Sequence, residues 1–156
     1  MEDVLISPEL VLMEIAADSD QEALEILARH LYEKNVVKES YVEAVKSRER
    51  AYSTGLEFAE MGIAIPHTDA KHVCKQAIAI GFLKDPVSFC HMGMPEVSVK
   101  TEILFMMAIK NPGDQVGFLE KMMDLFQTEG FLTALKACTT EKDVAEMFQK
   151  CLVSES

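Results

Sequence analysis

The sequence has no long hydrophobic run and no recognisable export signal. Its longest unbroken apolar stretch, Ile103–Ile109, is far shorter than the roughly 20 residues that a membrane-spanning helix needs. The opening sequence MEDVLISPEL is acidic and lacks the positively charged and then apolar pattern of a signal peptide. We therefore expect a cytoplasmic protein with no direct membrane contact.

Motifs of several common site types are also missing. The cysteines are scattered and form no CxxC pair, which predicts buried thiols in a reducing compartment and neither a disulfide framework nor a zinc site. The chain has no GxSxG motif of a serine hydrolase and no GxxxxGK loop for nucleotide phosphates. These absences exclude the best-marked hydrolase and nucleotide-binding classes.

Basic residues are scarce relative to acidic ones. The chain has 15 lysines and arginines against 26 aspartates and glutamates, so its formal net charge is −11. This charge argues against a nucleic-acid partner and favours a basic protein partner that is attracted over long range. With 156 residues, 49% of them hydrophobic, and no repeat or low-complexity linker, the chain is expected to form one domain over 1–156.

Apolar residues recur at helical spacing in several stretches. Two stretches open with a capping box, Ser19–Glu22 and Ser40–Glu43. The expected helices are 19–35, one from Ser40, one from Asp114, and shorter ones near 130–137 and 141–151. The expected inner face of the second helix is Tyr41, Ala44, Val45, Arg48 and Tyr52, and that of the third is Val116, Leu119, Met123 and Phe126.

The expected strands lie between these helices. Pro66 favours extended geometry at the residue before it, so Gly62–Ile65 is predicted to be a short strand. Glu102–Ile109 is nearly all apolar, which is typical of a central strand covered on both faces. Further strands are expected at Ala77–Leu83, at Val87–Phe89 after a turn at Asp85-Pro86, and at the edge at Val97–Val99. The predicted fold is α/β: a mixed β-sheet flanked by helices on both faces, in a single-domain three-layer sandwich.

The segment GIAIPHTDAKH places His67 directly after the short strand and Pro66. Ligands and catalytic groups gather beyond the carboxyl ends of strands in open α/β sheets. A largely uncharged imidazole at that place can carry a phosphoryl group, act as a general base, or make a purely structural hydrogen bond. A metal site is disfavoured, because His67 and His72 are five residues apart and helical metal-binding pairs are usually four apart.

Arg48 and Thr54 add to the case for phosphate. Arg48 lies on the inward stripe of its helix, and a buried guanidinium normally needs an anion. The alternative is that its charge lies in the last turn and interacts with the helix dipole. The hydroxyl of Thr54 either binds a phosphate oxygen or caps a turn, and Glu49 is expected to be solvent-exposed.

The segment SRERAYSTGLEFAEMGIAIPHTDAKH resembles the signature of the IIA (EIIA) domains of the sugar phosphotransferase system, in the group of the fructose, mannitol and galactitol transporters. The matching pieces are Arg48-Glu49, Thr54-Gly55 and Gly62–His67, and the resemblance covers nearly the full chain. It implies a phosphotransferase with a phosphohistidine intermediate, which requires no cofactor and no metal.

The resemblance also implies protein partners. Phosphohistidine carrier protein HPr would pass its phosphoryl group to His67, and His67 would pass it to a cysteine of the IIB subunit. The membrane subunit IIC would then take up and phosphorylate a sugar. Arg48 matches the family arginine near the phosphorylation site. The alternative function is regulatory, since some relatives bind target proteins according to their phosphorylation state or are modules of transcription regulators.

One departure from the family pattern implies a subgroup. Mannitol and fructose relatives carry a second active-site histidine at the start of the helix after the central strand, where this chain has Gln115. Galactitol-type relatives similarly have a glutamine there and a histidine at the place of His72. The resemblance therefore implies galactitol or a related sugar or polyol. Thr54, His72 and Gln115 are the candidates for further support of phosphate binding. Either Gln115 is a modest orienting donor, or another group supplies the positive charge that it lacks. His72 is the favoured candidate for that group, and the alternative is that His72 is a surface histidine.

Overall fold

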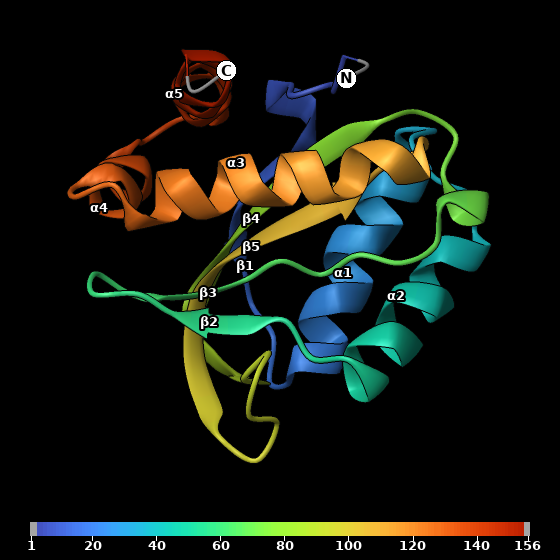
Figure 1. The fold of residues 1–156 in the computed structure, drawn as a ribbon, viewed down its shortest axis with the longest axis horizontal. Coiled ribbons are helices and arrows are strands. Elements are labelled where there is room, and N and C mark those ends of the chain that lie inside the picture. The colour runs from blue at the N-terminus through green and yellow to red at the C-terminus, as the bar shows by residue number, and fades with distance from the viewer. Residues whose placement is uncertain (1–2, 155–156) are drawn as a thin grey trace.

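The computed structural model describes residues 3–154, which fold around one mixed β-sheet (Figure 1). Its strands are β1 (Val11–Ile15), β2 (Gly55–Glu57), β3 (Gly62–Ala64), β4 (Ala77–Cys90) and β5 (Ser98–Ala108). Their order in the sheet is β1-β4-β5-β3-β2. The β1–β4 and β3–β5 pairs are parallel, and the β4–β5 and β2–β3 pairs are antiparallel. The predicted mixed sheet is confirmed, and the apolar strand β5 lies at its centre.

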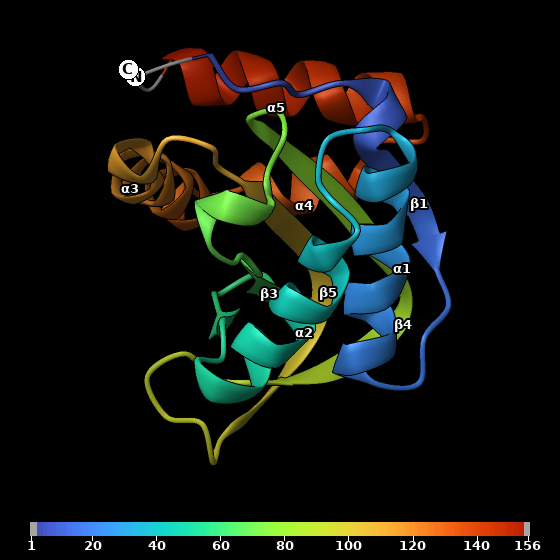
Figure 2. The same cartoon turned by 90° about the vertical axis from the view of Figure 1, so that its right-hand side faces the viewer.

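Helices cover both faces of this sheet, which confirms the predicted three-layer sandwich. One face packs against α1 (Asp20–Glu33) and α2 (Ser40–Ala51), and the other packs against α3 (Gln115–Gln127), α4 (Phe131–Ala137) and α5 (Glu141–Ser154) (Figure 2). Short 3-10 helices form at η1 (Pro8–Leu10), η2 (Ala70–His72) and η3 (Pro112–Asp114). Each face has its own apolar cluster, because neighbouring residues of β4 and β5 point to opposite sides of the sheet. None of the helices in the described chain is long and apolar enough to cross a membrane.

Of the capping box predicted at Ser19 the N-cap half is present, while Glu22 Oε1 accepts from the Asp18 N–H at 2.6 Å and not from Ser19; the capping box predicted at Ser40 is wrong. Ser19 Oγ accepts a hydrogen bond from the Glu22 N–H at 3.1 Å, so it caps α1. At α2 the N-cap is Glu39, without a side-chain cap, and Ser40 Oγ lies 2.8 Å from Nδ1 of His72. The local pattern predicted that the Ser40 hydroxyl caps α2. In the structure that hydroxyl instead contacts His72, which is distant in sequence.

The turn predicted at Asp85-Pro86 is also wrong. Strand β4 runs through both residues, and its register against β5 shifts between Phe82 and Val87. Proline lacks the N–H that a regular strand position would donate, and this irregular stretch does not require one. The expected edge segment at Val97–Val99 joins the central strand, so β4 and β5 form one long antiparallel pair. The short strands β1 and β2 were not predicted.

The inner face predicted for α3 is partly wrong. The residues buried against the sheet are Phe118, Met122, Leu125 and Phe126. Val116 is 63% exposed, and Leu119 is only half-buried. Tyr52, expected on the inner face of α2, is likewise 65% exposed. Cys74 and Cys90 are exposed as well, although buried thiols were expected.

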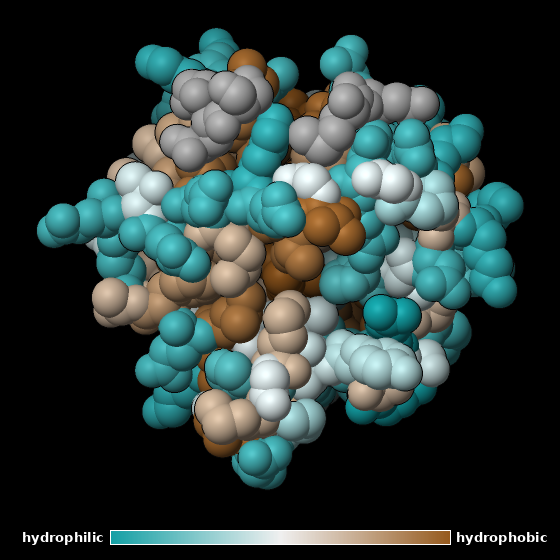
Figure 3. Space-filling view, in the orientation of Figure 1, coloured by the Kyte–Doolittle hydropathy of each residue, from teal (hydrophilic) through white to brown (hydrophobic). Residues whose placement is uncertain are grey.

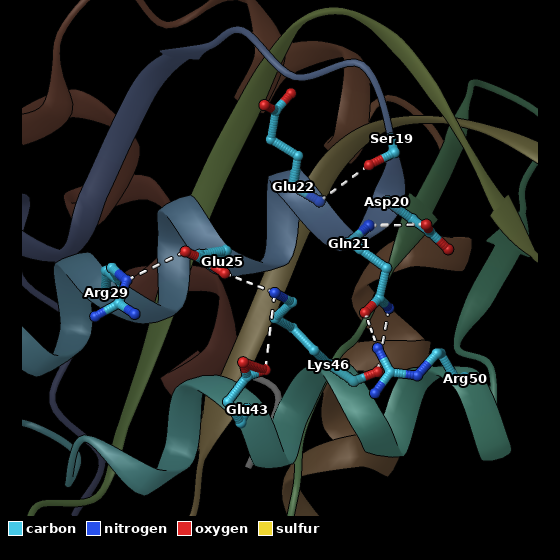
Figure 4. A network of polar contacts seen from close by, with 9 residues as sticks. All are labelled: Ser19, Asp20, Gln21, Glu22, Glu25, Arg29, Glu43, Lys46 and Arg50. Atoms are coloured by element: carbon cyan, nitrogen blue, oxygen red, sulfur yellow. Dashed lines mark hydrogen bonds and ion pairs between the residues drawn. The ribbon is translucent and has the colours of Figure 1, made fainter.

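Polar contacts fix α2 against α1 (Figure 4). Lys46 Nζ lies 2.6 Å from Oε1 of Glu25, and the Gln21 amide donates to the Lys46 carbonyl at 3.1 Å. Arg50 donates to the side chain of Gln21. These contacts hold the C-terminal half of α2 in place, and that half carries Arg48.

Candidate functional site

His67 follows β3 and is fixed by the neighbouring strand β5. Its backbone pairs in parallel with Met107, whose N–H donates to the Pro66 carbonyl at 2.9 Å. The hydroxyl of buried Tyr41 on α2 donates to the Met107 carbonyl at 2.7 Å. The predicted position of His67 beyond the carboxyl end of a strand is therefore confirmed, and α2 is tied to the same place.

The ring of His67 has a defined orientation. Its Nδ1 lies 2.9 Å from the Ile65 carbonyl oxygen. A carbonyl oxygen only accepts hydrogen bonds, so Nδ1 carries the hydrogen and the lone pair of the neutral ring is on Nε2. Burial lowers the pKa of His67 and the charge of Arg48 lowers it further, while the hydrogen bond to Ile65 opposes both effects. The lowered pKa favours the uncharged form of the ring.

His67 lines an open pocket of ≈ 420 Å³. Three other parts of the chain supply its walls: the end of α2 with the segment before β2, the β4–β5 connection, and α3. The lining residues are Arg48, Ala51, Tyr52, Ser53, Thr54, His67, Met92, Gly93, Pro95 and Leu119. The structure thus brings together three of the predicted site residues, His67, Arg48 and Thr54.

Arg48 contributes a positive charge to this pocket. Its Nε is buried and has no hydrogen-bond partner within the described part of the chain. The guanidinium carbon lies 4.6 Å from the ring centroid of Tyr52, a cation–π contact that holds the group without neutralising it. A buried donor without a partner is costly, so this place suits an anion that can accept from it.

Thr54 is held by Glu49, a residue that the sequence did not single out. Glu49 is 4% exposed, so the expectation that it faces solvent is wrong. Its carboxylate accepts from the Thr54 N–H at 2.7 Å and from the Thr54 hydroxyl at 2.8 Å. Burial raises the pKa of Glu49 to about 7, the Thr54 hydrogen bonds oppose this rise, and nearby Asp20 adds to it. The only sequence signal was its place next to Arg48 in the Arg-Glu pair.

His72 and Gln115 lie outside the set of residues that line the pocket. The imidazole of His72 contacts Ser40 at the start of α2, and Arg48 is eight residues further along that helix. At about 1.5 Å per residue, this separates the two places by about 12 Å along the helix axis. Gln115 begins α3 one turn before Leu119, so it is on the side of α3 that faces the pocket.

We predict that the pKa of His67 lies below that of an unstructured histidine and rises when Arg48 is replaced. Burial and a nearby positive charge both disfavour the protonated ring, so Arg48→Met removes one of the two effects. The measurement is an NMR titration of the ring protons in both proteins. An unchanged His67 pKa in Arg48→Met would show that the two groups do not interact.

No group of three or more histidine, cysteine, aspartate or glutamate side chains in the described chain is arranged to hold a metal ion.

Comparison with known proteins shows the family to which this chain is similar. Residues 4–151 match the family model described as "Phosphoenolpyruvate-dependent sugar phosphotransferase system, EIIA 2". The chain is 27% identical over 153 residues to an ascorbate-specific PTS system EIIA component of Shigella boydii, with 96% of each chain covered. It is 25% identical over 131 residues to a galactitol-specific EIIA component of Escherichia coli, with 83% of this chain and 85% of that protein covered.

This chain is also similar to part of a transcriptional regulator and to solved structures. The chain is 35% identical over 105 residues to the transcriptional regulator ManR of Bacillus subtilis, a match that covers 67% of this chain but 15% of that protein. The crystal structure of mannitol IIA from Escherichia coli has a similar fold, with a TM-score of 0.72, 19% identity and coverage of 95% and 99%. The complex of mannitol IIA with phosphorylated IIB gives a TM-score of 0.71, 18% identity and coverage of 97% and 99%.

Proposed function

We propose, from the premise that this chain belongs to the EIIA 2 family of the phosphoenolpyruvate-dependent sugar phosphotransferase system, that His67 is the residue that carries the phosphoryl group. As a PTS EIIA component the chain is a phosphotransferase that acts through a phosphohistidine. The proposed donor is phosphorylated HPr, and the proposed acceptor is a cysteine of a IIB subunit. The chain would be the phosphocarrier subunit of a sugar uptake system.

The observation that carries this proposal is the state of the His67 ring. Nδ1 is engaged by the Ile65 carbonyl, which leaves the lone pair of Nε2 available in a pocket that also holds the unpaired charge of Arg48. A nucleophile next to a buried cation is the pair that phosphoryl transfer needs, because this reaction depends on positioning and charge stabilisation.

The transfer can be written atom by atom. Nε2 of His67 attacks the phosphorus of the donor phosphohistidine, a new P–N bond forms, and the bond to the donor imidazole breaks. The lone pair of Nε2 becomes the new bond, so the His67 ring gains positive charge while Nδ1 keeps its hydrogen. The Ile65 carbonyl stabilises that charge, and Arg48 faces the charge on the phosphoryl oxygens. Attack by a IIB thiolate later reverses these roles and restores the neutral ring.

The surface around the pocket suits docking by proteins. Tyr52, Met92 and Met94 are exposed there, and Val116 is exposed on α3. Figure 3 shows hydrophobic side chains at the centre of the face it draws, with hydrophilic ones around them. The net charge of −11 attracts a basic partner. Mannitol IIA of similar fold has been solved in complex with phosphorylated IIB, which supports a IIB subunit as the partner here.

The experiment is a reconstituted transfer. The protein is incubated with phosphoenolpyruvate, the general phosphotransferase proteins and HPr, and the acid-labile phosphate is located by mass spectrometry. The expected result is phosphate on His67 that leaves when a IIB subunit is added. IIB subunits of galactitol and of ascorbate systems are both tested. The galactitol assignment rests on Gln115 and His72, whereas the ascorbate-specific relative has the higher identity and coverage.

A regulatory role is the second candidate, and the match to ManR favours it. The matched part of ManR is a small fraction of that regulator, so the likeness concerns a module. A regulatory protein would accept phosphate from HPr on the same histidine but would bind a target and not pass the phosphate on. Rapid loss of the phosphate to a IIB cysteine would decide for transport.

We predict that His72→Gln leaves the rate of transfer from phosphorylated HPr within about 2-fold of wild type, a change of less than about 0.5 kcal/mol in the barrier. His72 contacts Ser40 at the start of α2 and is not among the residues that line the pocket, so we expect that it does not supply the charge that Gln115 lacks. Gln115→Ala should have the larger effect, because Gln115 faces the pocket side of α3. A clear slowing in His72→Gln alone would restore His72 to the site.

A further inference from the structure

Glu49 is a buried carboxylate beside the pocket, and the proposed transfer at His67 gives it no role. It follows Arg48 on α2, and both of its oxygens accept hydrogen bonds from Thr54. Burying a carboxylate is costly unless its oxygens are satisfied, and a residue that only filled space there would be apolar. This contact therefore points to a function for the position of Thr54.

The contact connects to His67 through the edge of β3. Thr54 precedes β2 and accepts from the Ile65 N–H at 3.4 Å, which extends the β2–β3 pairing by one bond. The N–H and C=O of an extended residue point to the same side. The carbonyl of Ile65 is on that side too, and it accepts from Nδ1 of His67 at 2.9 Å. Thr54 and the His67 ring thus bind the two polar groups of one residue.

Glu49 does not neutralise Arg48. The two residues are adjacent on α2, and adjacent residues of a helix point in different directions. Both donors of Thr54 occupy the Glu49 oxygens, while Nε of Arg48 has no partner among the described residues. The arrangement satisfies the carboxylate and leaves the cation open to the pocket.

We propose that Glu49 is a positioning residue for phosphoryl transfer: it anchors Thr54, keeps the Ile65 carbonyl in place to fix the tautomer of His67, and leaves Arg48 free for the phosphoryl group. The effect of Glu49 on phosphoryl transfer rests on the proposed function. Its effect on the tautomer of His67 concerns the unphosphorylated protein and is independent of that function.

The test compares Glu49→Ala with Glu49→Gln. Glutamine keeps the anchor, because its oxygen accepts from the Thr54 N–H and its amide donates to the Thr54 hydroxyl, which is both donor and acceptor. ¹⁵N NMR of the His67 ring measures the tautomer. We expect the Nδ1–H form in wild type and Glu49→Gln, and a mixture with the Nε2–H form in Glu49→Ala. Single-turnover transfer from phosphorylated HPr should slow about 5-fold in Glu49→Ala, equivalent to about 1 kcal/mol, and recover in Glu49→Gln.

Glu60 provides a matched control. Its carboxylate accepts from the backbone N–H groups of Gly130 and Thr133 at 2.5 and 2.8 Å, and from the Thr133 hydroxyl at 2.8 Å. Like Glu49, Glu60 accepts hydrogen bonds from a backbone N–H and a threonine hydroxyl. Glu60 precedes β3, however, whereas His67 follows β3. Glu60→Ala should cost stability in a urea titration and leave the His67 tautomer and the transfer rate unchanged.

The results of these experiments distinguish the positioning role of Glu49 from the proposed function of His67. A wild-type tautomer population in Glu49→Ala would overturn the positioning role. Should Glu49→Ala not fold, Glu49→Leu removes both hydrogen bonds to Thr54 with an apolar side chain of similar size, and a wild-type tautomer there would overturn the role equally. Absence of phosphate on His67 in the wild-type protein would instead overturn the proposed function, and the tautomer measurement would stand.

Discussion

His67→Ala is expected to abolish phosphorylation of the protein by phosphorylated HPr. The variant removes the Nε2 lone pair that the Ile65 hydrogen bond leaves available, and no other imidazole lines the pocket formed by the described residues. Arg48 and Thr54 can position an anion but offer no nucleophile of comparable strength at neutral pH. The measurement is phosphate incorporation by mass spectrometry after incubation with phosphoenolpyruvate and the general phosphotransferase proteins.

His91→Ala is the matched control for this loss. His91 is next to the pocket residue Met92, and its Nδ1 accepts from the backbone N–H groups of Gly93 and Met94. It therefore shapes the wall of the pocket without offering that nitrogen to a ligand. His91→Ala should keep full phosphate incorporation at a reduced rate. Phosphate retained by His67→Ala would place the acceptor elsewhere and remove His67 from its proposed role.

Arg48→Met is expected to slow transfer from phosphorylated HPr by at least about 10-fold, in the range typical of a lost charge stabiliser. Methionine keeps much of the length and apolar character of the side chain but removes the charge and the unpartnered Nε. The free energy of unfolding should change by less than about 2 kcal/mol, because the guanidinium forms no buried ion pair with the residues that the structure describes and Tyr52, which it contacts, is largely exposed.

Arg50→Met controls for charge at the same helix end. Arg50 is exposed, and it donates to Gln21 on α1 and not into the pocket. It should keep a transfer rate within about 2-fold of wild type, since an exposed charge is screened by solvent and salt. Single-turnover kinetics and urea unfolding of both variants distinguish the two roles. If Arg48→Met unfolds easily but transfers phosphate at the normal rate when folded, the role of Arg48 is structural.

Much of the site is local in sequence and was therefore predictable. The place of His67 after a strand and Pro66 was predicted, because Pro66 restricts the backbone dihedral angles of itself and of the residue before it. The sequence did not show which group fixes the ring, which is the carbonyl of Ile65, two residues before it. Arg48 shares a stripe with Tyr41 and Val45, and a period of 3.6 residues is enough to place it on that side of α2. The order of helical and apolar segments likewise predicted the fold class.

The errors concern contacts between residues that are distant in sequence. Ser40 has the pattern of a helix cap, but His72, 32 residues away, binds its hydroxyl. Pro86 has the pattern of a turn, but pairing of β4 with β5 on both sides of it extends the strand through it. A local preference of this kind is worth about 1 kcal/mol, and a long-range contact of similar strength can override it.

The sequence by itself predicted that His67 lies beyond the end of a strand and which side of α2 carries Arg48, because these depend on bonds and periods within a few residues. Only the tertiary structure decided that Glu49 is buried, that its carboxylate holds Thr54, and that His72 is not among the residues that line the pocket. A helical period gives the direction of each side chain from the helix axis, but it does not say which neighbouring element covers that direction. Glu49 points about 100° away from Arg48 around the helix, toward a place that the segment before β2 fills when the sheet forms.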